Sequence, residues 1–136
     1  MMQADRQTQL EIQDILARYL DALTRTDVET IAADFTEDAS LLPAGHPPVH
    51  GRDAIAEWYR KSFAEGPRQV KVDIWETGGD GNLAYFTGRY HIMEGMNEGA
   101  AETDTGKVAV ILRREVGQKF KRHIVIYNDD GHAAQK

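Results

Sequence analysis

The chain has no cysteine, and this absence excludes disulfide bridges, thiolate metal sites and a cysteine nucleophile from its 136 residues. It also lacks a long apolar run at its start, since residues 1–10 are polar, so neither a secretory signal nor a membrane span is expected. Positive charge is in deficit, because 16 Lys and Arg oppose 22 Asp and Glu, which leaves a formal net charge of -6. An acidic molecule repels phosphate backbones and anionic membranes. We therefore expect a soluble, cytoplasmic protein that binds neither nucleic acid nor membrane.

The rest of the composition is that of an ordinary globular protein, with 41% hydrophobic and 28% charged residues. The length fits one domain over residues 1–136, with flexible ends at 1–5 and 131–136. Lys119, Lys121 and Arg122 form the one basic cluster, in a predicted strand beside a turn. We interpret these three side chains as the solvated face of that strand.

The first half of the chain has helical periodicity. Apolar residues recur at helical spacing over residues 6–24, which predicts an amphipathic helix. Thr26 or Asp27 can cap a second, shorter helix. Asp53 is expected to open a third helix, which Gly66 and Pro67 end.

The second half changes to the alternation typical of strands. A brief strand is expected at 39–42, and residues 43–51 hold too many prolines and glycines for a regular element. Four long strands are then predicted, at 69–77, 83–94, 107–115 and 119–128. The first two and the last two should form antiparallel hairpins, separated by a polar loop over 95–106. Helices that precede an antiparallel sheet define an α+β fold, in which the helices pack on one face of the sheet.

Four stretches carry a resemblance to a known family. Residues 36–55 (TEDASLLPAGHPPVHGRDAI) resemble the signature of SnoaL-like domains of the nuclear transport factor 2-like superfamily. Residues 83–90 (LAY and GRY), 104–107 (DTGK) and 127–130 (YNDD) fit the same family in order. The resemblance implies three N-terminal helices on a curved, mostly antiparallel sheet that together form a cone. It also implies a pocket for a small hydrophobic molecule, no cofactor and a homodimer through the outer sheet face.

The superfamily includes ketosteroid isomerases, polyketide cyclases and dehydratases as well as binding and assembly domains, so the fold does not select a reaction. The similarity to ketosteroid isomerases places Tyr19 where those enzymes hold the phenol that stabilises a dienolate oxygen, a role that suits a hydroxyl donor in a dry site. The alternative is a tyrosine of the core. Pro43, Val110 and Val125 stand where relatives carry acids. These losses argue against steroid isomerisation by the familiar mechanism.

The predicted strand 83–94 offers two faces, of which only one can point into the cone. Tyr90 shares one face with Ile92 and Glu94, whereas His91 lies on the other. If the His91 face is the inner one, His91 is a candidate general base, because the pKa of histidine lies near neutrality. Otherwise His91 is a surface or dimer-contact residue.

Further candidates for the pocket are aromatic or imidazole side chains. His123 and Tyr127 could line the pocket from the last strand, and His46 and His50 from the proline-rich loop. No recognisable metal signature spaces the two loop histidines with a third ligand, so we expect no metal. Aromatic residues of the third helix and the first long strand are interpreted as apolar wall, either core or pocket lining, namely Trp58, Tyr59, Phe63 and Trp75.

Three hypotheses of function follow from these residues. The first is a cofactor-free isomerase, cyclase or dehydratase that acts on a polyketide-like or steroid-like molecule, with Tyr19 as donor and His91 as base. The second is a non-catalytic module that binds a hydrophobic ligand. The third is a dimeric assembly domain, which predicts a cone filled with bulky side chains.

Overall fold

The computed structural model describes residues 4–67, 69–94 and 101–131, with the backbone alone at 94 and 101–103. The elements in chain order are α1 (Arg6–Arg25), α2 (Val28–Ala33), β1 (Phe35–Leu42), β2 (Val49–His50), α3 (Arg52–Phe63), β3 (Gln69–Asp80), β4 (Leu83–Glu94), β5 (Ala101–Arg113) and β6 (Lys121–Asp129). The predicted α+β class is confirmed. Among the described residues, no helix has both the length and the apolarity needed to span a membrane.

Side-chain caps define the two N-terminal helices. Asp5 begins α1 by accepting a hydrogen bond from the Thr8 amide at 2.8 Å, which satisfies one of the free N–H groups of the first turn. The neighbouring Ala4 is 4% exposed, and both residues lie within the range 1–5 that the sequence predicts to be a flexible end. Asp27 caps α2 by accepting from the Thr30 amide at 3.1 Å, as one of the two predicted caps.

Helix α3 is fixed at both ends by specific backbone contacts. It begins at Arg52, one residue before the predicted start, directly after Gly51 with its positive φ of 91°. The Arg52 Nε donates to the Phe35 carbonyl at 3.1 Å and so ties the start of α3 to β1. The Gly66 amide donates to the Phe63 carbonyl at 2.8 Å, which ends the helix where glycine and proline predict.

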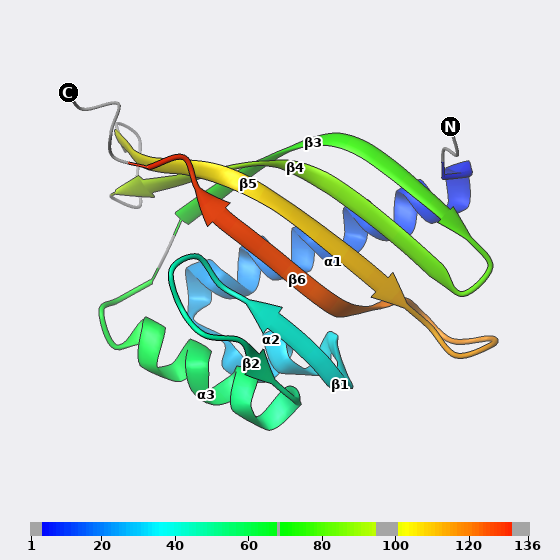
Figure 1. Ribbon diagram of the computed structural model, residues 1–136, viewed down its shortest axis with the longest axis horizontal. Coiled ribbons are helices and arrows are strands. Elements are labelled where there is room, and N and C mark those ends of the chain that lie inside the picture. The colour runs from blue at the N-terminus through cyan, green and yellow to red at the C-terminus, as the bar shows by residue number, and fades with distance from the viewer. Residues whose placement is uncertain (1–3, 68, 95–100, 132–136) are drawn as a thin grey trace.

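The six strands form one mixed sheet in the order β2-β1-β6-β5-β4-β3. The β3–β4 and β5–β6 hairpins are antiparallel, as predicted, whereas β1 pairs with β6 in parallel. Figure 1 shows the sheet curving over α1, with α2 and α3 beside β1 and β2. This curvature leaves a concave inner face toward the helices and a convex outer face.

Three segments contain more strand than the sequence predicts. Strand β1 begins at Phe35 rather than residue 39, and β2 forms inside the predicted loop 43–51. Strand β5 begins at Ala101, so residues 101–106 of the predicted loop 95–106 pair with β4, and residues 95–100 lie outside the described residues. Pairing satisfies backbone donors and acceptors whatever the side chains are, which polar composition does not reveal.

Register shifts interrupt the alternation of three long strands, β3, β5 and β6, and those in β6 and β3 change how named residues are interpreted. In β6, Arg122 pairs with Leu112 and Ile124 with Ile111, so His123 is the extra residue. In β3, Ile74 pairs with Gly88 and Glu76 with Thr87, so Trp75 is the extra residue there. Trp75 is 55% exposed, and its interpretation as apolar wall is therefore wrong.

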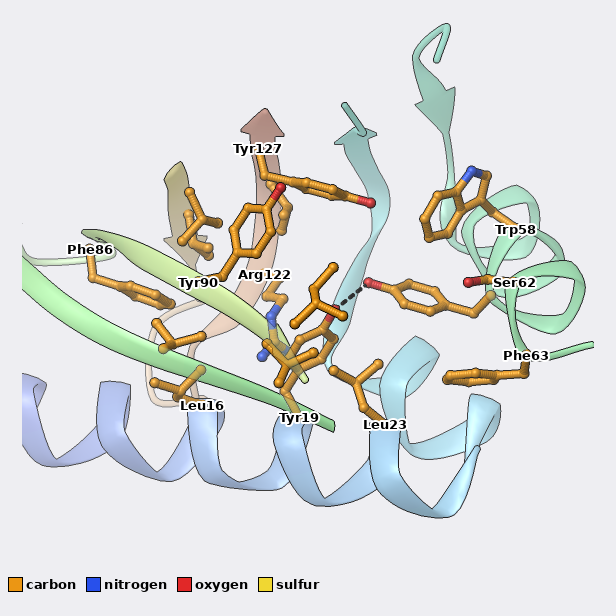
Figure 2. Close-up of a pocket in the computed structure, with 17 residues that line it drawn as sticks. Leu16, Tyr19, Leu23, Trp58, Ser62, Phe63, Phe86, Tyr90, Arg122 and Tyr127 are labelled. Carbon is orange, nitrogen blue, oxygen red and sulfur yellow. Dashed lines mark hydrogen bonds between the residues drawn. The ribbon is translucent and has the colours of Figure 1, made fainter. Parts of the chain in front are cut away.

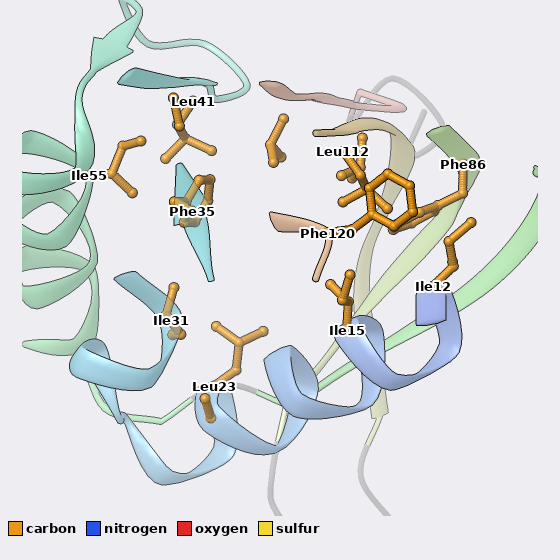
Figure 3. Close-up of a cluster of buried hydrophobic side chains, with 14 of the residues drawn as sticks. Ile12, Ile15, Leu23, Ile31, Phe35, Leu41, Ile55, Phe86, Leu112 and Phe120 are labelled. Atoms are coloured by element: carbon orange, nitrogen blue, oxygen red, sulfur yellow. The ribbon is translucent and has the colours of Figure 1, made fainter. Parts of the chain in front are cut away.

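The hydrophobic core lies between the helices and the inner face of the sheet (Figure 3). Ile12, Phe35, Ile55 and Leu112 have no exposed surface. Burying a side chain of this size stabilises the fold by about 1.5–3 kcal/mol. Arg122 is 3% exposed within the same layer, which corrects the interpretation of its cluster as a solvated strand face. The bulge at His123 is the cause, because it turns Arg122 inward.

Candidate functional site

A cavity lies between α1, α3 and the inner face of the sheet (Figure 2). The centre of a water-sized sphere can occupy about 120 Å³ of it, far more than the roughly 10–15 Å³ that one water needs. Its aliphatic and phenylalanine wall comes from α1, the four long strands and α3, and consists of Leu16, Leu23, Phe63, Val70, Val72, Phe86, Ile92, Val108, Val110 and Val125. The cone is therefore not filled, in contrast to what the assembly hypothesis predicts.

The remaining aromatic residues of the cavity come from opposite sides of it. Trp58 and Tyr59 project from α3, and Tyr90 and Tyr127 from β4 and β6. The Trp58 and Tyr59 rings meet edge to face with centroids 5.2 Å apart, and Tyr90 meets Tyr127 at 5.7 Å in the same way. Such pairs add to the energy of burial and hold the rings in place. Together with Phe63, these four are the predicted pocket residues that the structure places in the cavity.

Two phenols from different helices meet in the cavity. The hydroxyl oxygens of Tyr19 on α1 and Tyr59 on α3 lie 2.9 Å apart, so one donates a hydrogen bond to the other (Figure 2). Burial raises the pKa of Tyr59 well above its ordinary value, and the neighbouring Tyr19 adds to the increase. Tyr59 therefore acts as a hydroxyl and not as a phenolate at neutral pH. Sequence reasoning placed both residues but not their contact, because they are 40 positions apart.

Arg122 lines the cavity as its one charged residue among those the structure describes. Its Nη2 donates to the carbonyl of Ile15 at 3.3 Å, and its guanidinium carbon lies 4.3 Å from the centre of the Tyr19 ring. Burial lowers the pKa of Arg122, yet a guanidinium keeps its charge in proteins. Sequence reasoning missed this residue, since nothing in the alternation of β6 signals the bulge.

His91 does not share this cavity with Tyr19. Tyr90 points inward from β4, so His91 lies on the outer face, where its Nε2 is 2.9 Å from Asp73 Oδ2. The donor and base of the enzyme hypothesis therefore face opposite sides of the sheet. Glu94 ends β4, and its side chain lies outside the described part of the chain.

The other three candidate histidines also lie outside the cavity lining. The bulge residue His123 has its Nδ1 2.9 Å from the Thr36 hydroxyl, and its Nε2 lies 3.3 Å from Arg113 Nη1. His50 is exposed and bonds to the Ser40 hydroxyl at 2.9 Å. His46 is exposed too, with its ring centre 6.5 Å from that of Trp58. No group of three metal-ligating side chains occurs in the ranges that the structure covers.

The positions at which relatives carry acids are inert here. Val110 and Val125 line the cavity, and Pro43 is buried outside its lining. Within the described residues, the polar groups of the lining are four phenols, the Trp58 indole N–H, the Ser62 hydroxyl and the Arg122 guanidinium. Burial raises the pKa of Tyr90 to about 12, with smaller contributions from Asp129 and other acids. At neutral pH this set donates hydrogen bonds to an acceptor and offers no carboxylate or imidazole to take a proton.

Solved structures with the same fold support the assignment of its class. A ketosteroid isomerase-like protein from Erwinia carotovora atroseptica matches with a TM-score of 0.75 and 20% identity, over 90% of this chain and 95% of that chain. A protein with a cystatin-like fold from Nostoc punctiforme matches with a TM-score of 0.78 and 18% identity, over 95% and 96%. A protein from Catenulispora acidiphila, solved in complex with S-DNPA, matches with a TM-score of 0.79 and 18% identity, over 97% and 100%.

These likenesses define the fold as the cystatin-like, nuclear transport factor 2-like cone. Within this fold, one family can be assigned. The SnoaL-like domain family matches residues 16–123. The chain belongs to the SnoaL-like domain family. At these identities the solved structures show the fold alone, and the reaction or ligand must be argued from the cavity itself.

Proposed function

We propose that this protein binds a small, largely apolar molecule in the cavity between α1, α3 and the sheet, and that binding is its function. One observation carries the proposal. The cavity has an apolar wall and hydrogen-bond donors, without a described carboxylate or imidazole that could move a proton. Ligand sites of this kind take their affinity from apolar contact and their orientation from a few polar groups.

The cavity offers both kinds of contact. An aromatic or alicyclic ligand contacts the edges and faces of Trp58 and Tyr127, and its burial is worth about 25 cal/mol per Å² of apolar surface. The relative from Catenulispora acidiphila holds S-DNPA, which supports a ligand-binding role for a cone of this type. A polyketide-like or steroid-like molecule matches this apolar wall.

Calorimetric titration with 2-naphthamide, a neutral two-ring probe, tests the binding function. We expect saturable binding to the wild type. Val125→Phe, which places a ring in the cavity, should weaken this binding at least tenfold, because Val125 lines it. Ile124→Phe is the matched control, since Ile124 lies next to Val125 and pairs on the outer face. Equal affinity in all three proteins would contradict the proposal.

A second candidate function rests on the hydrogen bond between Tyr19 and Tyr59. Two linked phenols can stabilise an oxyanion, so an isomerase, cyclase or dehydratase step is supported where the substrate or water supplies the base. This hypothesis predicts that bound 2-naphthol ionises at a lower pH than free 2-naphthol, which its absorbance reports. Tyr19→Phe and Tyr59→Phe should each reduce the shift, whereas His91→Ala on the outer face should not. An unshifted wild type would leave binding as the only function.

A second copy of the chain is the proposed protein partner. Leu83, Ile111 and Ile126 on the convex side are 53%, 38% and 45% exposed, which supports a homodimer through the sheet. Sedimentation velocity should show a dimer that Ile111→Asp converts to a monomer. Val116→Asp, in the β5–β6 turn, is the control and should leave the dimer intact. A monomeric wild type would refute this part of the proposal.

A further inference from the structure

The Arg122 guanidinium is a buried cation without full compensation. Its Nη1 has no hydrogen-bond partner among the described residues, and less than 1 Å² of this nitrogen is exposed, so bulk water does not supply one. Nη2 donates to the Ile15 carbonyl. No carboxylate of the described chain forms an ion pair with it, although the charge of Asp34 attracts it over a longer distance, and its guanidinium carbon lies over the rings of Tyr19 and Phe35, at 4.3 and 5.9 Å.

Such an arrangement is unfavourable in the empty protein. Burying a charge is strongly destabilising unless a partner of opposite charge or several hydrogen bonds compensate for it. Ring faces attract a cation only weakly by comparison. An apolar side chain at this position would pack against the same rings without that cost. The cation is therefore best explained by a partner that enters the cavity with the opposite charge.

The other groups of the cavity are compatible with an anion. The hydroxyls of Tyr59, Tyr90 and Ser62 can donate to it, and the raised pKa values of Tyr59 and Tyr90 keep both phenols neutral. No described carboxylate lines the cavity, and Asp104, Asp129 and Asp130 act on Tyr90 from outside the lining. A neutral carbonyl oxygen would accept a hydrogen bond but would leave the charge of Arg122 unbalanced.

Resting on the proposed binding function, we propose that the ligand of this cavity is an apolar molecule with a single carboxylate, and that Arg122 binds this carboxylate. The planar guanidinium matches a carboxylate in charge and shape. A rotation of the Arg122 side chain, which already lines the cavity, brings Nη1 to a carboxylate oxygen. The apolar part of the ligand then lies against the aromatic residues of α3 and β6 (Figure 2).

Calorimetric titration with 2-naphthoate and 2-naphthamide tests this assignment, because the two probes share their ring system and shape and differ in charge. The wild type should bind the carboxylate about tenfold more tightly or better, as for a hydrogen bond to a charged group. Arg122→Met should abolish this preference, read as the ratio of the two affinities, since methionine keeps an unbranched apolar side chain without the charge. Arg122→Lys, which keeps the charge but not the planar, paired N–H donors of the guanidinium, should retain part of the preference.

Lys121→Met is the matched control, because it removes a cation from the preceding residue, which pairs with Arg113 on the outer side. The preference should be unchanged in this variant. Equal binding of the two probes by the wild type, or a preference that persists in Arg122→Met, would overturn the inference and leave the binding function standing. If neither probe binds at millimolar concentration, both proposals fail. Arg122→Lys decides the role of the charge if Arg122→Met does not fold.

Discussion

The two faces of the sheet carry different kinds of polar group. On the convex outer face, carboxylates pair with bases in solvent, as in Arg113 with Asp38 at 2.7 Å and Lys107 with Asp130 at 2.6 Å. On the concave side, the described polar groups that line the cavity are phenols, the Trp58 indole N–H, a serine hydroxyl and the Arg122 guanidinium, while Asp104 and Asp129 share this face next to Tyr90. The paired carboxylates of the outer face are exposed, and exposed ion pairs contribute little to stability. The cavity lining itself holds no described carboxylate or imidazole.

This difference separates stability from recognition. Outer pairs are screened by water and salt, so their loss changes the fold by small amounts. Inner groups act in a water-poor site, where a single charge selects strongly between ligands. The largest losses of stability should come from the apolar part of the inner face and the smallest from the outer carboxylates.

Adjacent residues of β5 give the sharpest test of this contrast. Leu112 is fully buried on the inner face, and Ile111 is 38% exposed on the outer face. Leu112→Ala should lower the free energy of unfolding by about 2–5 kcal/mol, because it leaves a cavity in the core. Ile111→Ala should lower the free energy of unfolding by well under about 2 kcal/mol, below the range expected for a buried residue. Urea unfolding followed by circular dichroism measures both, and two protein concentrations separate any effect of association. Equal losses would break the comparison.

Two glycines give an effect of intermediate size. A Cβ on Gly106 would overlap the Tyr90 ring on the inner face and the Asn128 carbonyl. Gly106→Ala should therefore lower the free energy of unfolding by about 1–3 kcal/mol. It should also weaken the binding of 2-naphthamide, since Tyr90 must leave its place in the cavity wall. A Cβ on Gly78 would overlap the Tyr85 ring, whose hydroxyl bonds to Glu76 on the outer face. Gly78→Ala should leave binding unchanged, and a matching loss of affinity there would refute the role of Tyr90.

The smallest expected effect is the acid response of the outer face. Hydrogen bonds from Lys107 and Thr105 lower the pKa of Asp130, and one from Arg113 lowers that of Asp38. A carboxyl whose folded pKa lies below its unfolded value stabilises the protein above about pH 4, and this contribution is lost as the pH falls through the folded pKa. In Asp130→Asn, the melting temperature should fall less between pH 7 and pH 2.5 than it does in the wild type.

The inner face supplies the control for that titration. Binding of 2-naphthamide should not change between pH 6 and pH 9, because the Tyr59 and Tyr90 phenols titrate well above this range. A binding curve that follows a pKa near neutrality would show that an imidazole or carboxylate reaches the cavity.

Sequence reasoning succeeded where periodicity decides the structure. The apolar stripe of α1, the cap at Asp27 and the two hairpins follow from local spacing, and the tyrosine of α1 and the aromatic residues of α3 were found through the stripe and the resemblance. The inner face of β4 could not be chosen from alternation alone, which left Tyr90 and His91 as alternatives. The contact between Tyr19 and Tyr59 depends on how α1 and α3 pack, which no local pattern encodes.

The bulge at His123 determines which kind of base reaches the cavity. In a strand of unbroken alternation, His123 would share the inner face with Val125 and Tyr127, and Arg122 would face solvent. The extra residue exchanges an imidazole, whose charge varies around neutrality, for a guanidinium that is permanently cationic. Deleting His123 would restore alternation and keep Arg122 inside, because Arg122 and Val125 would then lie two residues apart. The charge inside the cone is thus set by the register of β6 as well as by the residues of its wall.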